Sequence, residues 1–218
     1  MSTPVCVVLG AGPGLGLAVA RRFAAEGYHA VLAARLSEHA EPLAAMLRDE
    51  GHGAEGAGVD LTDPAAVHDV IGGIGERHGR IDLLHFNPSV WREKDPLHLT
   101  VPELLEDVAL GAGALLPAVQ AARPFMRAGA RVLVTGSAAA DTPFHGAASL
   151  GVQKAAVRNL VTSLDATLAP DGIRAVAVQV NGVLGKEGPF SPAPIADAMW
   201  RAVSRPDGEW TPHVPYDG

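Results

Sequence analysis

An apolar run that breaks into a glycine-rich turn opens the sequence. Residues 5–9 are all apolar, and Gly10, Gly14 and Gly16 follow in the spacing G-x-x-x-G-x-G. Glycine is needed where the backbone adopts positive φ and where amides approach a phosphate closely, beside a helix N-terminus whose partial positive charge favours an anion. The stretch therefore predicts a strand, a turn and a helix that bind the pyrophosphate of a dinucleotide. The residues predicted to contact it are Gly10, Gly12, Pro13, Gly14, Leu15 and Gly16.

Apolar strand-like runs alternate with helical patterns along the rest of the chain. This alternation predicts an α/β fold with a parallel sheet buried on both faces. We expect one Rossmann-type, doubly wound domain over residues 1–218, with about seven strands, helices on both faces and a short substrate loop at about 182–193. Strands are predicted over 5–9, 29–34, 56–60, 81–86, 131–135, 173–180 and 210–214, and helices over 15–26, 37–50, from 63 onward, 101–127, 147–168 and 195–203.

Composition and charge argue against several classes of protein. A formal charge of −7 without a cluster of Lys and Arg argues against nucleic-acid binding. The single cysteine, Cys6, lies inside the first apolar run, and no two of the nine histidines have the spacing of a helical zinc pair, so neither a disulfide nor a metal site is predicted. The sequence starts without a basic and apolar leader, and no apolar run approaches the roughly 18 residues of a membrane helix. We therefore expect a cytoplasmic protein without membrane association.

A basic residue follows the second predicted strand. In open parallel sheets, ligands bind beyond the carboxyl ends of the strands, and an acidic residue at this point hydrogen-bonds the ribose hydroxyls of NAD, whereas a basic one suits the 2′-phosphate of NADP. Arg35 stands there, directly after the run that ends at Ala34. The sequence therefore predicts NADP as the cofactor.

Three segments resemble those of the short-chain dehydrogenase/reductase (SDR) family. The turn L-G-x-x-x-G-x-G at 9–16 is similar to the family's T-G-x-x-x-G-x-G, V-D-L at 59–61 to its D-V segment, and N-P-S at 87–89 to its N-N-A-G segment. The resemblance implies that the acidic segment lies near the adenine and that the residues after the fourth and sixth strands hold the cofactor. The cofactor contacts implied in this way are Asp60, Leu61, Asn87, Pro88, Lys154 and Val183.

The catalytic region resembles the family only in part. Ser137 stands where the family has the serine that orients the substrate carbonyl, and Lys154 where it has the lysine that holds the nicotinamide ribose. Leu150 occupies the position of the proton-transferring tyrosine, and Gly111 that of the asparagine of the tetrad. The chain is thus expected to be an atypical member. A histidine near its unperturbed pKa can act as acid or base at neutral pH, and His145 is predicted to replace the tyrosine.

Three functions are compatible with these residues. The first is an NADP-dependent oxidoreductase that acts on a small apolar substrate with Ser137 and Lys154, the proton coming from His145, a water relay or the substrate itself. The second is a lyase, isomerase or cyclase on the same scaffold, and the third is a non-catalytic nucleotide sensor or partner subunit. The resemblance also implies a homodimer or homotetramer formed through the helices at 101–127 and 147–168.

Overall fold

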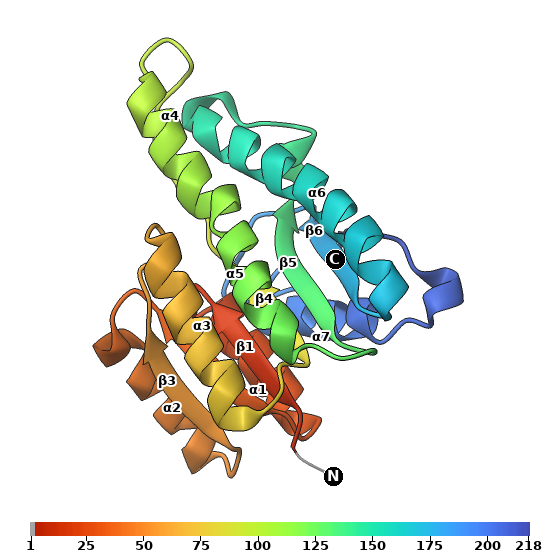
Figure 1. Ribbon diagram of the computed structural model, residues 1–218. Coiled ribbons are helices and arrows are strands. Elements are labelled where there is room, and N and C mark those ends of the chain that lie inside the picture. The colour runs from red at the N-terminus through yellow and green to blue at the C-terminus, as the bar shows by residue number, and fades with distance from the viewer. Residues whose placement is uncertain (1–2) are drawn as a thin grey trace.

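The computed structural model describes residues 3–218, and its centre is one parallel sheet of seven strands. The strands lie in the order β3-β2-β1-β4-β5-β6-β7, so the chain winds outward from β1 in one direction and from β4 in the other (Figure 1). The predicted doubly wound sheet is confirmed. Its strands are β1 (Val5–Leu9), β2 (His29–Ala34), β3 (Ala54–Gly58), β4 (Leu83–Phe86), β5 (Arg131–Ser137), β6 (Arg174–Val180) and β7 (His213–Tyr216).

Helices cover both faces of the sheet. α3, α5 and α6 pack on the face that carries Val7 and Phe86, and α1, α2 and α7 pack on the face that carries Cys6 and Val8 (Figure 1). Successive strand residues point to opposite faces, and because both faces are covered, the strands are apolar at nearly every position. The helices are α1 (Leu15–Ala25), α2 (Ser37–Asp49), α3 (Pro64–His78), α4 (Val101–Val108), α5 (Leu115–Ala122), α6 (Ala148–Leu168) and α7 (Pro192–Val203).

The single helix predicted over 101–127 is interrupted, and this prediction is corrected. α4 leads into a π-helical turn, Ala109–Gly113, before α5 begins, and a 3₁₀ turn at Arg123–Phe125 ends the helical run. At Gly111, a Cβ atom would lie 2.1 Å from Oε1 of Gln153 on α6. A side chain from another helix thus occupies the space beside the π turn. Local periodicity carries no information about such a long-range contact, so the break could not be predicted from it.

The same stretch, Val101–Phe125, is long and apolar enough to cross a membrane by length and composition alone. This corrects the expectation that no stretch approaches that length. A core helix of a folded domain passes the same test, and here α5 packs against α3 while the π turn packs against α6. The burial of one helical face against these neighbours accounts for the apolar composition.

Several predicted element boundaries shift as well. β4 begins at Leu83 rather than at 81, and β5 extends to Ser137 rather than to 135. β3 covers Ala54–Gly58 rather than 56–60, because its pairing with β2 places Ala54 opposite Ala30. α7 begins at Pro192 rather than at 195, since proline is well tolerated in the first turn of a helix. The tail strand is β7 rather than 210–214, because the Trp210 side chain turns inward and its Nε1 donates a hydrogen bond to Asp165 at 3.0 Å.

The segment between β6 and α7, where the substrate loop was predicted, is held by the C-terminal tail. The hydroxyl of Tyr216 donates to the carbonyl of Pro189, and the Phe190 and Tyr216 rings meet edge to face with centroids 5.7 Å apart. The side-chain amide of Asn181 donates to Asp217 at 2.8 Å. The position of this loop therefore depends on residues that follow it by more than twenty positions.

Two glycines of α3 should respond in opposite ways to alanine. A Cβ atom on Gly75 would lie 2.1 Å from Cδ2 of Phe125, whereas Gly72 has nothing within 4 Å. Gly75→Ala should therefore lower the free energy of unfolding by about 1–3 kcal/mol through overpacking. Gly72→Ala should raise it by up to about 1 kcal/mol, because alanine is the better helix former. Urea unfolding followed by circular dichroism measures both; equal effects would contradict the packing described for Phe125.

Candidate active site

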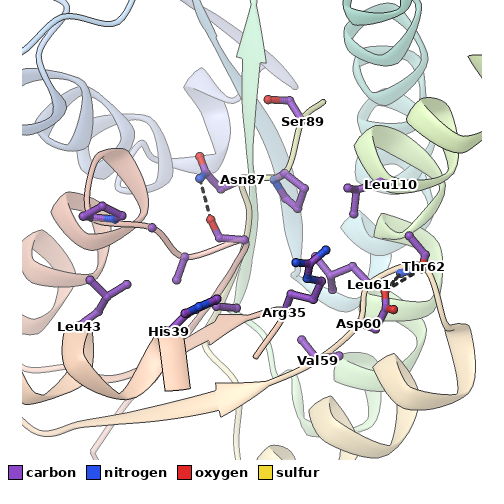
Figure 2. Close-up of a pocket in the computed structure, with 16 residues that line it drawn as sticks. Arg35, His39, Leu43, Val59, Asp60, Leu61, Thr62, Asn87, Ser89 and Leu110 are labelled. Atoms are coloured by element: carbon purple, nitrogen blue, oxygen red, sulfur yellow. Dashed lines mark hydrogen bonds between the residues drawn. The ribbon is translucent and has the colours of Figure 1, made fainter. Parts of the chain in front are cut away.

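A cleft of about 700 Å³ opens at the carboxyl ends of β1, β2 and β4 (Figure 2). These strands flank the point at which the chain reverses its direction of winding, and this is where open α/β sheets bind ligands. The cleft brings together eight of the residues predicted to contact the cofactor. They are Gly10, Gly12, Pro13, Arg35, Asp60, Leu61, Asn87 and Pro88.

Two glycines of the turn, Gly10 and Gly16, lie against ring or backbone atoms that leave no room for a side chain, whereas Gly12 and Gly14 have nothing within 4 Å. Gly10 has a φ of +71°, and a Cβ on it would lie 3.0 Å from Cγ of Pro88. A Cβ on Gly16 would lie 2.9 Å from the Cα of Ala11. Gly14 precedes α1, and Leu15 is buried in the core, so these two residues and Gly16 form the start of the helix rather than the cleft wall. The first amides of a helix have no intrahelical acceptor and face the turn.

Arg35 extends from the end of β2 into the cleft, close to Asp60 (Figure 2). Within residues 3–218, its guanidinium makes no hydrogen bond and no ion pair. Oδ1 of Asp60 accepts hydrogen bonds from the Thr62 hydroxyl at 2.7 Å and the Thr62 amide at 2.9 Å, and these bonds lower the pKa of Asp60. His39, four residues beyond Arg35, lines the same end of the cleft and was not predicted. The only sign in the sequence that His39 lies here is its position four residues after Arg35, in the first turn of α2.

A chain of hydrogen bonds links the glycine turn to the centre of the sheet. The amide Nδ2 of Asn87 donates to the Gly10 carbonyl at 3.1 Å, and its Oδ1 accepts from the Thr135 hydroxyl at 2.8 Å (Figure 2 shows the first of these). Nε2 of His85 lies 3.0 Å from the same hydroxyl. Because the single hydroxyl proton of Thr135 goes to Asn87, Nε2 of His85 must be the donor in this pair.

His85 is therefore a neutral histidine with its proton on Nε2. Complete burial and, to a smaller extent, the nearby charge of Lys154 lower its pKa to about 3. Its Nδ1 has no hydrogen-bond partner among the described residues. The buried His85 side chain thus packs in the core as part of a polar network that fixes Asn87.

Lys154 and Ser137 are both fixed at the end of β5. Nζ of Lys154 donates to the Thr135 carbonyl at 2.9 Å, and Oγ of Ser137 accepts from the Ala139 amide at 3.2 Å. Only 4% of Lys154 is exposed, and this burial lowers its pKa to about 8. Leu150 lies one turn before Lys154 on α6. The end of β5 thus carries an amine that can exchange a proton near neutral pH beside a hydroxyl.

Gln153 is a site residue that the sequence did not single out. It is fully buried, its Oε1 accepts from the Val90 amide at 2.9 Å, and its Nε2 donates to the Val90 carbonyl at 3.1 Å. Its side chain also fills the space beside Gly111. Gln153 thereby fixes the segment after β4 against α6, directly beside Lys154. A polar residue next to the lysine was the only signal in the sequence.

Besides the three residues at the start of α1, four predicted site residues do not line the cofactor cleft: Ser137 and Lys154 at the end of β5, and His145 and Val183. His145 is exposed in a short 3₁₀ turn, where it lines a second, largely apolar cleft of about 570 Å³ between α4 and α6. Val183, on the loop after β6, is 90% exposed and does not line the cofactor cleft. Their predicted roles stay predictions.

The sequence of this chain is similar to those of known short-chain dehydrogenases. A family model described as short chain dehydrogenase matches residues 4–186. The chain belongs to the short-chain dehydrogenase/reductase family. Cis-4-hydroxycyclohexanecarboxylate dehydrogenase of Sinomonas cyclohexanicum is 33% identical to this SDR over 177 residues, which are 80% of this chain and 71% of that protein. A short chain dehydrogenase/reductase of Cryptosporiopsis sp. (strain 8999) is 28% identical over 193 residues, 80% of this chain and 75% of its own.

A solved SDR structure shares the whole architecture. A metagenomic short-chain oxidoreductase, crystallised in complex with NADP, superposes with a TM-score of 0.88 at 27% identity, over 98% of this chain and 96% of that one. This SDR is therefore an oxidoreductase of the family type, for which NAD(P) is the typical cofactor.

Raising the pH should stabilise the wild-type SDR relative to a Lys154→Met variant. The pKa of Lys154 is about 8 in the folded chain and 10.5 without burial. Between these values only the unfolded chain binds the proton, so wild-type stability rises with pH. Below pH 8 both states are protonated, and the wild type bears the full cost of a buried ammonium. Urea unfolding at pH 7, 8.5 and 10 should show a relative gain of up to about 3 kcal/mol. A difference that does not change with pH would contradict the lowered pKa.

Proposed function

We propose that this SDR is an NADP-dependent oxidoreductase that acts on a small apolar substrate. The observation that carries the proposal is the unpaired guanidinium of Arg35 in the cofactor cleft. A planar guanidinium binds phosphate oxygens through two parallel hydrogen bonds, and a guanidinium without a protein partner is available for the 2′-phosphate. The imidazole of His39 borders the same end of the cleft and can add a donor.

The rest of the cleft fits a dinucleotide. The close contacts of Gly10 and Gly16 with Pro88 and Ala11 leave a bare backbone surface at the start of α1, which suits a pyrophosphate. One oxygen of Asp60, Oδ2, makes no hydrogen bond in residues 3–218 and can accept from an adenine amino group. When bound, NADPH supplies a hydride.

The proton has a plausible source in Lys154. Its pKa of about 8 matches the requirement for proton exchange near neutral pH. Its Nζ is held by a hydrogen bond to the carbonyl of Thr135, which precedes Ser137 by two residues in the chain. We infer that Lys154, acting through water, supplies the proton and that Ser137 orients the substrate. Leucine at 150 cannot transfer a proton, so substrates with an activated C=C or C=N bond should react better than ketones.

Arg35→Asp should change the cofactor preference. Loss of a charge-assisted contact and gain of a carboxylate should weaken NADPH binding by about 10- to 100-fold and leave NADH binding equal or stronger. Arg35→Lys is the matched control, because it keeps the charge. Titration of intrinsic tryptophan fluorescence with each nucleotide measures the two dissociation constants. An unchanged ratio of the NADPH and NADH constants in Arg35→Asp would exclude Arg35 from cofactor selection.

Three variants separate the possible proton donors. Leu150→Tyr should raise NADPH-dependent ketone reduction by about 100-fold or more, because it adds a general acid one turn before Lys154. Lys154→Met should abolish reduction of activated alkenes and imines, whereas His145→Ala should change it less than about twofold. Steady-state rates with a panel of these substrates decide the matter. A large loss in His145→Ala with full activity in Lys154→Met would transfer the role to His145.

A further inference from the structure

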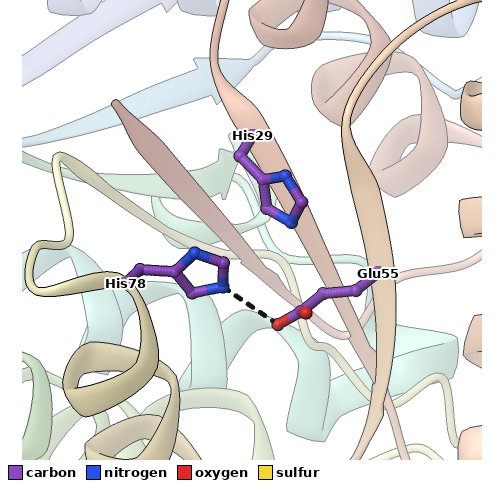
Figure 3. Close-up of side chains that lie close together, drawn as sticks. All are labelled: His29, Glu55 and His78. Carbon is purple, nitrogen blue, oxygen red and sulfur yellow. Dashed lines mark hydrogen bonds and ion pairs between the residues drawn. The ribbon is translucent and has the colours of Figure 1, made fainter. Parts of the chain in front are cut away.

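Three side chains that could bind a metal meet at the end of the sheet where the strands begin. His29 is the first residue of β2, Glu55 lies near the start of β3, and His78 ends α3. Figure 3 shows the three side chains pointing toward one another, and one ligand atom from each lies within 4.8 Å of the others. The cofactor cleft opens at the opposite ends of the same strands. The group therefore lies outside the site described above.

The spacing within this His29–Glu55–His78 group suits a metal. Nε2 of His78 lies 3.2 Å from Oε1 of Glu55. A tetrahedral zinc with bonds of about 2.0–2.1 Å holds neighbouring ligand atoms about 3.3 Å apart. Two imidazoles and one carboxylate form a ligand set that zinc uses with one position left for water.

The third ligand is a buried nitrogen without a partner. Nε2 of His29 has no hydrogen-bond partner among residues 3–218 and is inaccessible to solvent. The rings of His29 and His78 lie 4.8 Å apart, centroid to centroid. On its other edge, Nδ1 of His29 approaches the backbone at Gly53 so closely that a Cβ there would lie 2.8 Å away. The ring is thus held in place with Nε2 unsatisfied, which normally costs free energy.

The carboxylate of Glu55 has room for a cation beside its present partners. Its Oε1 accepts from Arg77 at 2.9 Å and lies 3.2 Å from Nε2 of His78. A zinc ion bound to Oε1 and to Nε2 of His78 would replace the His78 contact and leave the Arg77 hydrogen bond in place, because a carboxylate offers about four lone-pair sites.

We propose that His29, Glu55 and His78 bind one zinc ion. The ion can reach them through a shallow cleft of about 500 Å³ that His29, His52 and His78 border. Because it would join β2, β3 and the end of α3, the ion would stabilise this edge of the sheet and take no part in hydride transfer. Histidine spacing along the sequence could not show such a site, since its ligands come from three separate elements.

Zinc binding by the chelator-treated full-length chain tests the proposal. Isothermal titration calorimetry should show one zinc per wild-type chain. His29→Ala and His78→Ala should each weaken binding by more than about 100-fold, because loss of a ligand exceeds the 10- to 100-fold effect of losing a supporting partner. His52→Ala is the matched control, since it borders the same cleft outside the group and should bind as the wild type does. Circular dichroism verifies folding, and Glu55→Gln replaces any variant that fails to fold.

A second variant identifies the location of the metal. In His78→Cys, Co²⁺ should produce a thiolate-to-cobalt charge-transfer band that the wild type lacks. The only native cysteine, Cys6, is fully buried with a raised pKa and does not contribute this band. The proposal is overturned if the wild type binds no stoichiometric zinc, if His29→Ala and His78→Ala bind as tightly as His52→Ala, or if Co²⁺ in His78→Cys gives no thiolate band.

Discussion

The hydrogen bonds that join Gly10, Asn87, Thr135 and His85 hold the functional end of the sheet together. They connect β1, β4 and β5 across the point where the winding reverses. The same residue, Thr135, uses its hydroxyl to fix Asn87 and its carbonyl to fix Lys154. His85 is fully buried and Gly10, Asn87 and Thr135 are half-buried, so a polar group left unpaired here would cost free energy. The glycine turn and Lys154 are therefore positioned by one network rather than by two independent sets of contacts.

The two ends of the parallel strands carry different kinds of side chains. At the carboxyl ends of the strands, the cofactor cleft offers glycine backbone, an arginine without a protein partner and a carboxylate with one free oxygen. At the amino ends, the His29–Glu55–His78 group offers two imidazoles and a carboxylate. β2 contributes to both, with His29 at its start and Arg35 just after its end. Only residues 30–34 separate these two side chains along the chain.

The sequence predicted the fold and half of the residues that line the cofactor cleft, because local patterns determine them. Strand alternation, the glycine spacing and the position of Arg35 after β2 all act within a few residues, and the cleft contains eight of the predicted contacts. Contacts between distant segments could not be predicted in this way. Gln153 reaches Val90 across sixty-three positions, and His29 meets His78 only because β2 and α3 share an edge. His145 follows Ser137 closely in sequence, yet a turn carries it to another cleft.

Gly111 and Gln153 limit how a chain of this kind can change. An asparagine at 111, the residue implied there by the family resemblance, would place its Cβ 2.1 Å from the Gln153 amide. Shortening Gln153 first would leave the amide and carbonyl of Val90 without their partners. Each single step is thus unfavourable, although the pair could be exchanged together. The two positions form an epistatic unit, so a single substitution does not convert this pair into an asparagine at 111 with a compatible partner.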